Sequence, residues 1–346
     1  MLDQVSELTR GREADWTRFV DAHPCGTIFH ELIWRDVLQR TFGHRMVYLL
    51  AERAGEVVGV LPLVRIKSIF FGTSLVSVPF GVYGGLLTQD AVATQSLVAA
   101  AQAAQTAHGA GYVELRHLVP PDGVSLPTKD LYATFVCELP PSREDVLGRM
   151  PRKARAEARK AREKAGLTVD QGPLNLNEFH ELFARNKRSL GSPVFPKSLF
   201  RNIQDILGDR CYTLTVRHEG RPLTSVMNFV RKGTLMAYYS GAAEDANRFS
   251  ANNLMYVAVM EDGVDRGLTE FDFGRSRKAT GAFEFKKNQG FEAKDLFYQY
   301  LLKPGDQLPE VNASNPKFNV AKKVFRNLPP FIAEKIGAFV VKRMPI

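Results

Sequence analysis

A basic segment, residues 149–164, is the first part of this sequence in which side-chain type and spacing point to chemistry. It holds eight Lys or Arg residues against two Glu. The arginines recur at helical intervals on one stripe: Arg152, Arg155, Arg159 and Arg162. Like charges at these spacings repel one another, so the stripe predicts an anionic ligand, either a polyanion, an anionic lipid surface or a phosphorylated substrate. The alternative is a solvated helix face.

A second group of polar residues follows an apolar segment near residue 270. Arg275 comes directly after a strand expected over 269–274, at the carboxyl end where α/β sites open. Asp272 alternates with Phe271 and Phe273, so it faces the opposite side of that strand and could accept the proton of an amine nucleophile. A purely structural pairing of Asp272 with Arg275 is the alternative.

Composition limits the class of protein. The 346 residues are 45% hydrophobic and 24% charged, which predicts a globular chain of about two domains. No apolar stretch approaches the length of a membrane span, and the polar N-terminus does not resemble a secretory signal. Cys25, Cys137 and Cys211 are odd in number and far apart, which indicates a reducing compartment. We expect a cytoplasmic protein with no metal site and no tightly bound cofactor.

The motifs of several enzyme classes are absent. The sequence has no GxGxxG after a strand, no GxxxxGK[ST], no G-x-S-x-G and no H-E-x-x-H. Dinucleotide-dependent enzymes, P-loop enzymes, α/β-hydrolases and zincins are therefore not supported.

The elements that must position these residues occur twice. Each half contains an apolar hairpin with a turn ending in glycine, a short apolar segment, a helix and a strand. The first copy comprises 46–66, 82–87, 91–108 and 112–118, and the second comprises 211–231, 237–242, 252–266 and 269–274. This predicts a diverged duplication of an α/β (α+β) unit with a mixed central sheet flanked by helices, although chance similarity remains the alternative.

The order of elements in each copy is typical of the GNAT acyltransferase fold, and Asn288–Phe291 (NQGF) resembles its closing mark. Acetyl-CoA enzymes of this fold place a glycine-rich loop before the central helix, where backbone N–H groups bind pyrophosphate. The matching stretch here, DANRFSANNLMY, contains no glycine. We therefore expect weak binding of acetyl-CoA.

Together these features resemble the Fem-type aminoacyl and peptidyl transferases, over nearly the whole chain to about Leu302. The narrower likeness is to the FemAB-related group associated with exosortase and exopolysaccharide gene clusters. The segments that carry it are HPCGTIFHELIW, VPFGVYGG, MPRKARAEARKARE, LGSPVFPKSLF, FSANNLMY and FDFGRSRKATGAFEFKKNQGF.

The resemblance implies roles for particular residues. A lysine of the closing F-K segment lies at the reaction centre of the family, and its match is Lys286, with Lys287 beside it. A fixed cation at the oxyanion of acyl transfer contributes about 3 kcal/mol or more. Basic residues hold the acceptor's diphosphate, so Arg152, Arg155, Arg159 and Lys287, with Tyr83, are candidate substrate-binding residues, and Lys286, Asp272 and Arg275 are candidate catalytic residues. A surface lysine is the alternative for Lys286, and core packing is the alternative for Tyr83.

We predict two tandem GNAT-like domains, 1–148 and 149–302, followed by a basic tail, 303–346, and we expect the basic helix to cross between the domains. The predicted activity is transfer of an aminoacyl or acyl group from aminoacyl-tRNA or an acyl thioester to a phosphorylated or lipid-linked cell-envelope or exopolysaccharide precursor. One alternative is an acyl-CoA- or acyl-carrier-protein-dependent N-acyltransferase acting on a sugar or lipid. The other is a non-catalytic envelope-assembly protein that binds anionic glycan or lipid. The amphipathic end of the tail either packs on its own domain or contacts the inner membrane face peripherally.

Overall fold

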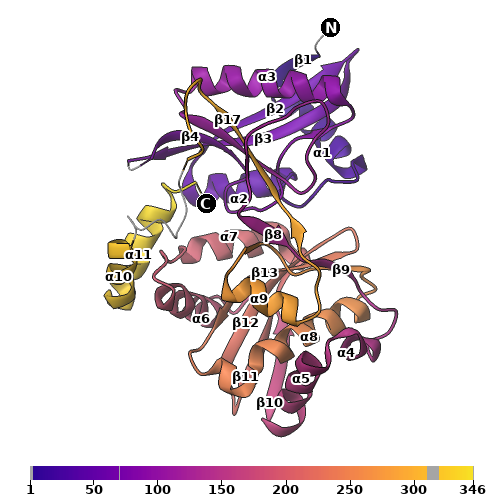
Figure 1. The fold of residues 1–346 in the computed structure, drawn as a ribbon, viewed down its shortest axis with the longest axis vertical. Helices are drawn as coiled ribbons and strands as arrows, with labels where there is room; N and C mark the ends of the chain where they lie inside the picture. Colours follow the sequence, from indigo (N-terminus) through magenta and orange to yellow (C-terminus); the bar gives the residue numbers. More distant parts are fainter. Residues whose placement is uncertain (1–2, 70, 310–318, 346) are drawn as a thin grey trace. The chain divides into compact units, whose positions relative to one another are not determined.

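The computed structural model describes residues 3–69, 71–309 and 319–345 (Figure 1). The chain divides into two compact units. Unit 1 contains residues 1–131, 295–315 and 339–346, and unit 2 contains residues 132–294 and 316–338. The predicted boundary at residue 148 therefore differs from the observed division, because the chain passes into the second unit at Tyr132.

Unit 1 is built on a sheet with the order β1-β2-β3-β4-β6-β17-β7, in which β5 also pairs with β3. Its strands are β1 (Gln4–Glu7), β2 (Arg45–Arg53), β3 (Glu56–Ser68), β4 (Gly72–Ser77), β5 (Leu87–Thr88), β6 (Tyr112–His117), β7 (Thr128–Lys129) and β17 (Phe297–Leu302). Its helices are α1 (Glu13–Ala22), α2 (Leu32–Phe42) and α3 (Ala91–Ala107). Helix α3 packs on β2 and β3, and its Leu97 and Ala101 lie in the core.

Unit 2 is built on a sheet with the order β10-β11-β12-β13-β14-β9, beside a small sheet with the order β15-β8-β16. The strands are β8 (Tyr132–Thr134), β9 (Val136–Glu138), β10 (Leu167–Gly172), β11 (Cys211–His218), β12 (Arg221–Arg231), β13 (Thr234–Ala242), β14 (Glu270–Asp272), β15 (Ser276–Arg277) and, at the boundary of the units, β16 (Lys294–Asp295). The helices are α4 (Asp145–Arg149), α5 (Arg152–Lys164), α6 (Leu176–Ser189), α7 (Lys197–Leu207), α8 (Ala251–Asp265), α9 (Gly281–Asn288), α10 (Asn319–Asn327) and α11 (Pro330–Val341), of which α11 continues into unit 1.

The two units share one strand order, which confirms the predicted tandem architecture. Strands β2-β3-β4-β6 of unit 1 correspond to β11-β12-β13-β14 of unit 2, with β4 parallel to β6 and β13 parallel to β14. Both predicted hairpins form. Their turns, at Ala54-Gly55 and Glu219-Gly220, place two consecutive residues at positive φ, a geometry that suits the twist of a hairpin and favours glycine.

One predicted equivalence is wrong. Residues 82–87 were expected to be the counterpart of 237–242, yet of these only Leu87 lies in a strand. The counterpart of β13 is β4, because β4 is the strand that follows the first hairpin and pairs parallel with β6. The segment GTSLVS contains two serines and a threonine, so its apolar pattern is weak in the sequence.

Each sheet is completed by a strand from the other half of the chain. Strand β9 precedes the basic helix in sequence but pairs antiparallel with β14 in unit 2. Strand β17, which lies within the predicted C-terminal domain 149–302, pairs antiparallel with β6 in unit 1 (Figure 1). Local patterns identified both hairpins and β14, but they did not identify which strands pair across the sequence.

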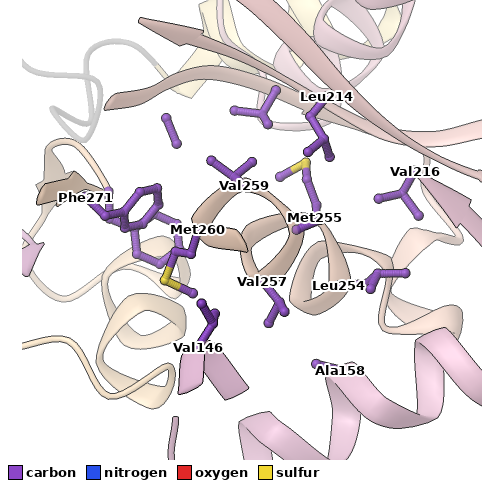
Figure 2. Packing of buried hydrophobic residues seen from close by; sticks show 14 of the residues in the cluster. Val146, Ala158, Leu214, Val216, Leu254, Met255, Val257, Val259, Met260 and Phe271 are labelled. Atoms are coloured by element: carbon purple, nitrogen blue, oxygen red, sulfur yellow. The ribbon is translucent and has the colours of Figure 1, made fainter. Parts of the chain in front are cut away.

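The basic helix α5 lies within unit 2, whereas we expected it to cross between domains. Its buried residues Ala154, Ala158 and Ala161 form a narrow seam against α8. Figure 2 shows α8 at the centre of this core, with Ala158 on one side and Leu214 and Val216 of β11 on the other. These three alanines are therefore packing residues as well as good helix formers.

Candidate functional site

The sheet of unit 2 opens at the carboxyl end of its parallel strands. Strand β14 pairs with β13 from Glu270 to Asp272, and β13 then continues to Ala242 without this partner. A β-bulge between β12 and β13 falls at Tyr238, since the register passes from Tyr239 to Ala237. Openings of this kind are where α/β folds place their ligands.

Lys286 lies at this opening and is buried, with 8% of its surface exposed. Its ammonium donates hydrogen bonds to the carbonyl oxygens of Gly274, at 2.8 Å, and Arg275, at 3.4 Å. The Nζ atom also lies 5.0 Å from the ring centre of Phe273 and 5.6 Å from that of Phe135. The alternative that it is a surface lysine is therefore excluded.

The surroundings of Lys286 bring its pKa down to about 7. Burial is the main cause because it penalises the charged form, the negative charge of Asp272 opposes the shift, and the positive charge of Arg275 adds to it. A lysine in this state is ammonium and amine in comparable amounts near neutral pH, a property common in functional sites.

Asp272 holds the turn that presents acceptors to Lys286. It is buried, and its Oδ1 accepts hydrogen bonds from the backbone N–H of Gly274, at 2.7 Å, and from the hydroxyl of Thr134, at 3.4 Å. Through these bonds Oδ1 positions the turn at Gly274. The role of Asp272 as a proton acceptor stays a prediction.

Arg275 and Lys187 complete a cationic cluster with Lys286. The guanidinium carbon of Arg275 lies 4.5 Å from the ring centre of Tyr132. The Nζ atom of Lys187, on α6, lies 5.2 Å from the ring centres of both Phe183 and Phe195. Burial is the main cause that lowers the pKa of Lys187 to about 8, and the positive charge of Arg275 contributes to the same shift.

Tyr239 of β13 lies within the field of the same cluster. Burial raises its pKa well above the ordinary value, and the charge of Arg275 opposes that shift. We name Lys187, Arg275 and Lys286 the cationic cluster. The charge of Arg275 lowers the pKa of both lysines, so this group of three cations favours an anion or a developing negative charge.

Lys187 was missed by the sequence analysis. It lies in the last turn of α6, beside Arg188 and ahead of the quoted LGSPVF segment, in a position where basic residues are common at any helix end. Only the packing of Phe183 and Phe195 around its side chain distinguishes it.

The remaining predicted residues lie elsewhere. Lys287 is exposed on α9, with its Nζ 5.8 Å from the ring centre of Phe283. Tyr83 belongs to unit 1, is 2% exposed and packs edge-on against Phe29, which is the placement of a core residue. Its proposed role in substrate binding has no geometric support.

The arginine stripe of α5 divides in two. Arg162 donates to Glu261 Oε2 at 2.7 Å, and the same carboxylate accepts from Arg143 at 3.0 Å. Arg152, Arg155 and Arg159 have no carboxylate partner among the residues that the structure describes. Glu261 therefore neutralises part of the positive charge of the stripe, and the charges of Arg152, Arg155 and Arg159 remain available to a ligand.

The N-terminus of α8 carries a carboxylate from the chain itself. Ser250, at a φ of 54°, donates its hydroxyl hydrogen to Glu157 Oε2 of α5. A helix N-terminus attracts anions, and the carboxylate of Glu157 supplies the negative charge at this one. This is the position at which a glycine-rich loop would otherwise present backbone N–H groups to pyrophosphate.

Within the described ranges, no group of three His, Cys, Asp or Glu side chains could hold a metal ion. No helix in the same part of the chain is long and apolar enough to cross a membrane.

Comparison with known proteins agrees with the fold described above. Residues 148–287 match the family described as acetyltransferase (GNAT) domain. The crystal structure of FemX superposes with a TM-score of 0.65 at 17% identity, covering 87% of this chain and 98% of that one. This chain has a tandem GNAT fold, which it shares with FemX.

Other solved structures share the fold. One is the C-terminal domain of a putative lysylphosphatidylglycerol synthetase from Agrobacterium fabrum, with a TM-score of 0.55 at 12% identity over 86% of this chain and 92% of that one. Another is a tandem GNAT protein from the clavulanic acid biosynthesis pathway, with a TM-score of 0.55 at 12% identity over 88% and 99%. No curated protein sequence matches this chain. The resemblance to Fem-type transferases is thus confirmed in the fold, and the narrower likeness to the exosortase-associated group stays a prediction.

Proposed function

We propose that this protein is a Fem-type aminoacyl- or acyltransferase that acts on a phosphorylated or lipid-linked precursor of the cell envelope or of an exopolysaccharide. The observation that carries the proposal is the cationic cluster at the opening between β13 and β14, with the Lys286 ammonium fixed by two backbone carbonyls. The shared fold of FemX supports the same reaction class.

The reaction would proceed by attack of an acceptor amine or hydroxyl on the carbonyl carbon of an activated ester or thioester. A C–N or C–O bond forms, an oxyanion develops, and the C–O or C–S bond to the donor then breaks, with the nucleophile's proton passing to the leaving group. Two N–H groups of the Lys286 ammonium are engaged by Gly274 and Arg275, which leaves the third to stabilise the oxyanion.

The other cations suit the anionic part of a substrate. Lys187 and Arg275 offer charge beside the reacting centre, and Arg152, Arg155 and Arg159 offer it along α5. Arginine binds phosphate oxygens through paired N–H donors, so a phosphorylated or diphosphate-linked acceptor would match this distribution.

The donor is either an aminoacyl-tRNA or an acyl thioester. The family matched by residues 148–287 favours a thioester, as in the alternative of an acyl-CoA- or acyl-carrier-protein-dependent N-acyltransferase. The carboxylate of Glu157 at the N-terminus of α8 disfavours coenzyme A, because it repels the pyrophosphate. Aminoacyl-tRNA or an acyl-carrier protein is therefore the preferred donor.

The test is incubation of the full chain with envelope-precursor pools and three labelled donors: aminoacyl-tRNA, acyl-CoA and acyl-carrier protein. Mass spectrometry would identify a product that carries the donor's acyl group. Transfer from tRNA should weaken steeply with salt, since phosphate contacts release counterions. Absence of transfer from every donor, together with binding of anionic glycan, would favour the alternative of a non-catalytic assembly protein.

A further inference from the structure

A basic pocket lies in unit 1, among residues that the proposed chemistry does not use. It has a volume of about 330 Å³, which is enough for one small ligand. The residues around it come from the end of α2, from β2 and β3 and from the segment after α11: Gly43, His44, Arg45, Arg65, Lys67, Lys342 and Arg343. All of them belong to unit 1, and none is acidic.

The strands bring three of these cations to one face of the sheet. Arg45 lies directly opposite Arg65 in the antiparallel pair of β2 and β3, and Lys67 lies two residues beyond Arg65 on the same strand. Side chains two residues apart on a strand, and those directly opposite on its neighbour, point to the same face. Like charges in such positions repel one another, so an anion bound beside them would stabilise the arrangement.

The pocket lies at the end of the sheet where β2 begins and β3 ends. Ligand sites of α/β folds open at the carboxyl ends of parallel strands, which in unit 1 are the ends of β4 and β6 at Ser77 and His117. Strand β3 runs antiparallel to β4, so Lys67 pairs with Thr73 near the start of β4 and lies at the opposite end. The basic pocket is therefore not a second copy of the opening described in unit 2.

The charges on the strands are only partly neutralised within the chain. Arg45 donates to the carboxylate of Glu7 at 2.8 Å, and Nη2 of Arg65 donates to the backbone oxygen of His108 at 3.2 Å. The Nε atom of Arg65 is buried and has no hydrogen-bond partner in the described part of the chain. Lys67 is exposed and has no carboxylate partner there. Arg65 and Lys67 therefore keep their charges for a ligand.

The segment after α11 adds two cations that are held within unit 1. The backbone oxygen of Pro345 accepts a hydrogen bond from Arg116 of β6 at 3.3 Å, and the guanidinium carbon of Arg343 lies 3.7 Å from the ring centre of Phe339. Lys342 is exposed, and neither it nor Arg343 forms an ion pair with a carboxylate among the residues that the structure describes.

His44 adds a buried polar group to the lining. Gly43, at a φ of 65°, ends α2 and turns the chain so that His44 precedes β2. The imidazole stacks on Phe42 with 5.4 Å between the ring centres, and Phe42 stacks on Phe80 at 4.6 Å. Its Nε2 atom is buried and has no hydrogen-bond partner among the described residues. A buried polar atom without a partner, in a residue that lines a pocket, indicates a ligand.

We infer that the basic pocket binds the phosphate group of a small ligand, either a phosphate monoester or a diphosphate. Arginine donates paired N–H groups to phosphate oxygens and lysine supplies a point charge, and the pocket contains both. A singly charged carboxylate would leave most of this positive charge unbalanced, whereas these phosphates carry about two or more negative charges. A pocket that receives one group does not match the extended row of phosphates along RNA.

This inference goes beyond the proposed function and does not rest on it, because its residues lie in unit 1 and its test needs no transfer reaction. The full chain, with isotope-labelled histidine, is titrated with inorganic pyrophosphate near neutral pH and followed by NMR. The imidazole signals of His44, identified by their absence from His44→Gln, should shift in a saturable manner. Arg155→Ala should leave this curve unchanged, which separates the basic pocket from the arginine stripe of unit 2.

The protonation of His44 gives a second readout. Burial is the main cause that lowers its pKa to about 4, and the positive charge of Lys342 contributes to the same shift. An anion bound beside Lys342 offsets that charge, so saturating pyrophosphate should raise the pKa of His44. A pH titration of the same signals with and without pyrophosphate measures this, and an unchanged or lower pKa would contradict binding in the pocket.

A paired variant tests the cations of the pocket. Lys67→Gln with Lys342→Gln removes two exposed charges and should weaken pyrophosphate binding by about tenfold or more. The matched control, Arg10→Gln with Lys303→Gln, removes two exposed cations of unit 1 outside the pocket and should bind pyrophosphate as the wild type does. Equal melting temperatures of the two paired variants confirm that a loss of binding is not a loss of folding.

Two further probes identify the source of the phosphate group. Glycerol 1-phosphate that shifts the His44 signals would assign a soluble phosphorylated molecule, and a shift caused only by phosphatidylglycerol vesicles would assign a lipid headgroup. Either result supports the phosphate site. His44 signals that respond to none of these probes, or an equal loss of binding in the control pair, would overturn the inference. A response to a short RNA duplex alone would also overturn it and assign the pocket to nucleic acid.

Discussion

Lys286 illustrates how a buried environment changes what a residue can do. An exposed lysine is fully charged at neutral pH and binds anions only weakly against water, whereas the Lys286 ammonium is held in place by the carbonyl groups of Gly274 and Arg275. Its position therefore needs no rearrangement when an oxyanion forms, which is the condition under which an electrostatic contribution is large.

Replacement of Lys286 by Met should lower kcat by about two to three orders of magnitude, because it removes the charge that stabilises the oxyanion. In the wild type, the ammonium is the required form, so kcat should decline as the pH rises through about 7, the pKa of Lys286. The measurement is a pH–rate profile once the acceptor is known. Equal activity of Lys286→Met and wild type would refute the catalytic assignment and favour a binding protein.

Stability supplies the control for that variant. The pKa of Lys286 is lower in the folded than in the unfolded chain, so the folded state disfavours the charged form. The free energy of unfolding of the wild type should therefore rise, relative to Lys286→Met, as the pH increases from about 7 toward the ordinary lysine value of 10.5. Denaturant unfolding at several pH values tests this. A free energy of unfolding that falls over this pH range would show that the folded state favours the charged form of Lys286.

At the scale of elements, α5 has two faces with different roles. Its alanine seam packs on α8, and Arg162 is tied to Glu261, whereas Arg155 is half-buried without a carboxylate partner in the described residues. We expect the two arginines to respond differently to replacement although they share one helix.

Arg155→Ala should raise KM with kcat little changed, because charge-assisted bonds to an anionic acceptor are present in both ground and transition states. Arg162→Ala is the matched control. It should lower the melting temperature, since Glu261 loses one of its two cations, but it should leave KM unchanged. If both variants raise KM equally, the stripe acts only through the overall positive charge of the helix.

The N-terminus of α8 determines how tightly the protein should bind coenzyme A. With Glu157 bonded to Ser250 at this position, acetyl-CoA should bind with a dissociation constant no tighter than about 0.1 mM, equivalent to about 5.5 kcal/mol. Titration calorimetry is the measurement, and micromolar binding would restore the ordinary acetyltransferase as the preferred function.

At the scale of the whole molecule, exchange of β9 and β17 makes each unit depend on both halves of the chain. Tyr298 and Tyr300 of β17 are buried in unit 1, where their hydroxyls donate to the backbone oxygen of Val82, at 3.1 Å, and to Glu114, at 2.9 Å. Without β17, β6 loses its antiparallel neighbour, and the backbone oxygen of Val82 and the carboxylate of Glu114 lose these hydrogen-bond donors.

A fragment of residues 1–148 should therefore fail to fold cooperatively, although it spans the whole predicted N-terminal domain. It lacks β17, and its β9 has no β14 to pair with. Circular dichroism during heating should show no sharp transition, whereas residues 1–131 joined by a flexible linker to 295–309 should restore one. A cooperative melt of the 1–148 fragment alone would show that β17 is dispensable.

The sequence by itself determined the local units and their repetition. The turns at Ala54-Gly55 and Glu219-Gly220 each depend on two consecutive residues at positive φ. The start of α5 after Pro151 and the alternating apolar segments also depend on residues that are close in sequence. Local features of this kind can be predicted from the sequence. The resemblance identified Lys286 as a candidate residue for the same reason, because the residues around it form one continuous motif. The narrow alanine seam of α5 and the weak pattern of β4 were harder to interpret because neither carries a strong local signal.

Only the tertiary structure decided which strands complete each sheet and which charges share one site. Lys187 lies 99 residues before Lys286 in the sequence. Its pKa is lowered by burial and by the charge of Arg275, and the rings of Phe183 and Phe195 lie beside its ammonium. Glu157 reaches the N-terminus of α8 across a separation of 93 residues. Burial and electrostatic fields depend on distance in space, and the pairing of distant strands brings these groups together only after the chain has folded.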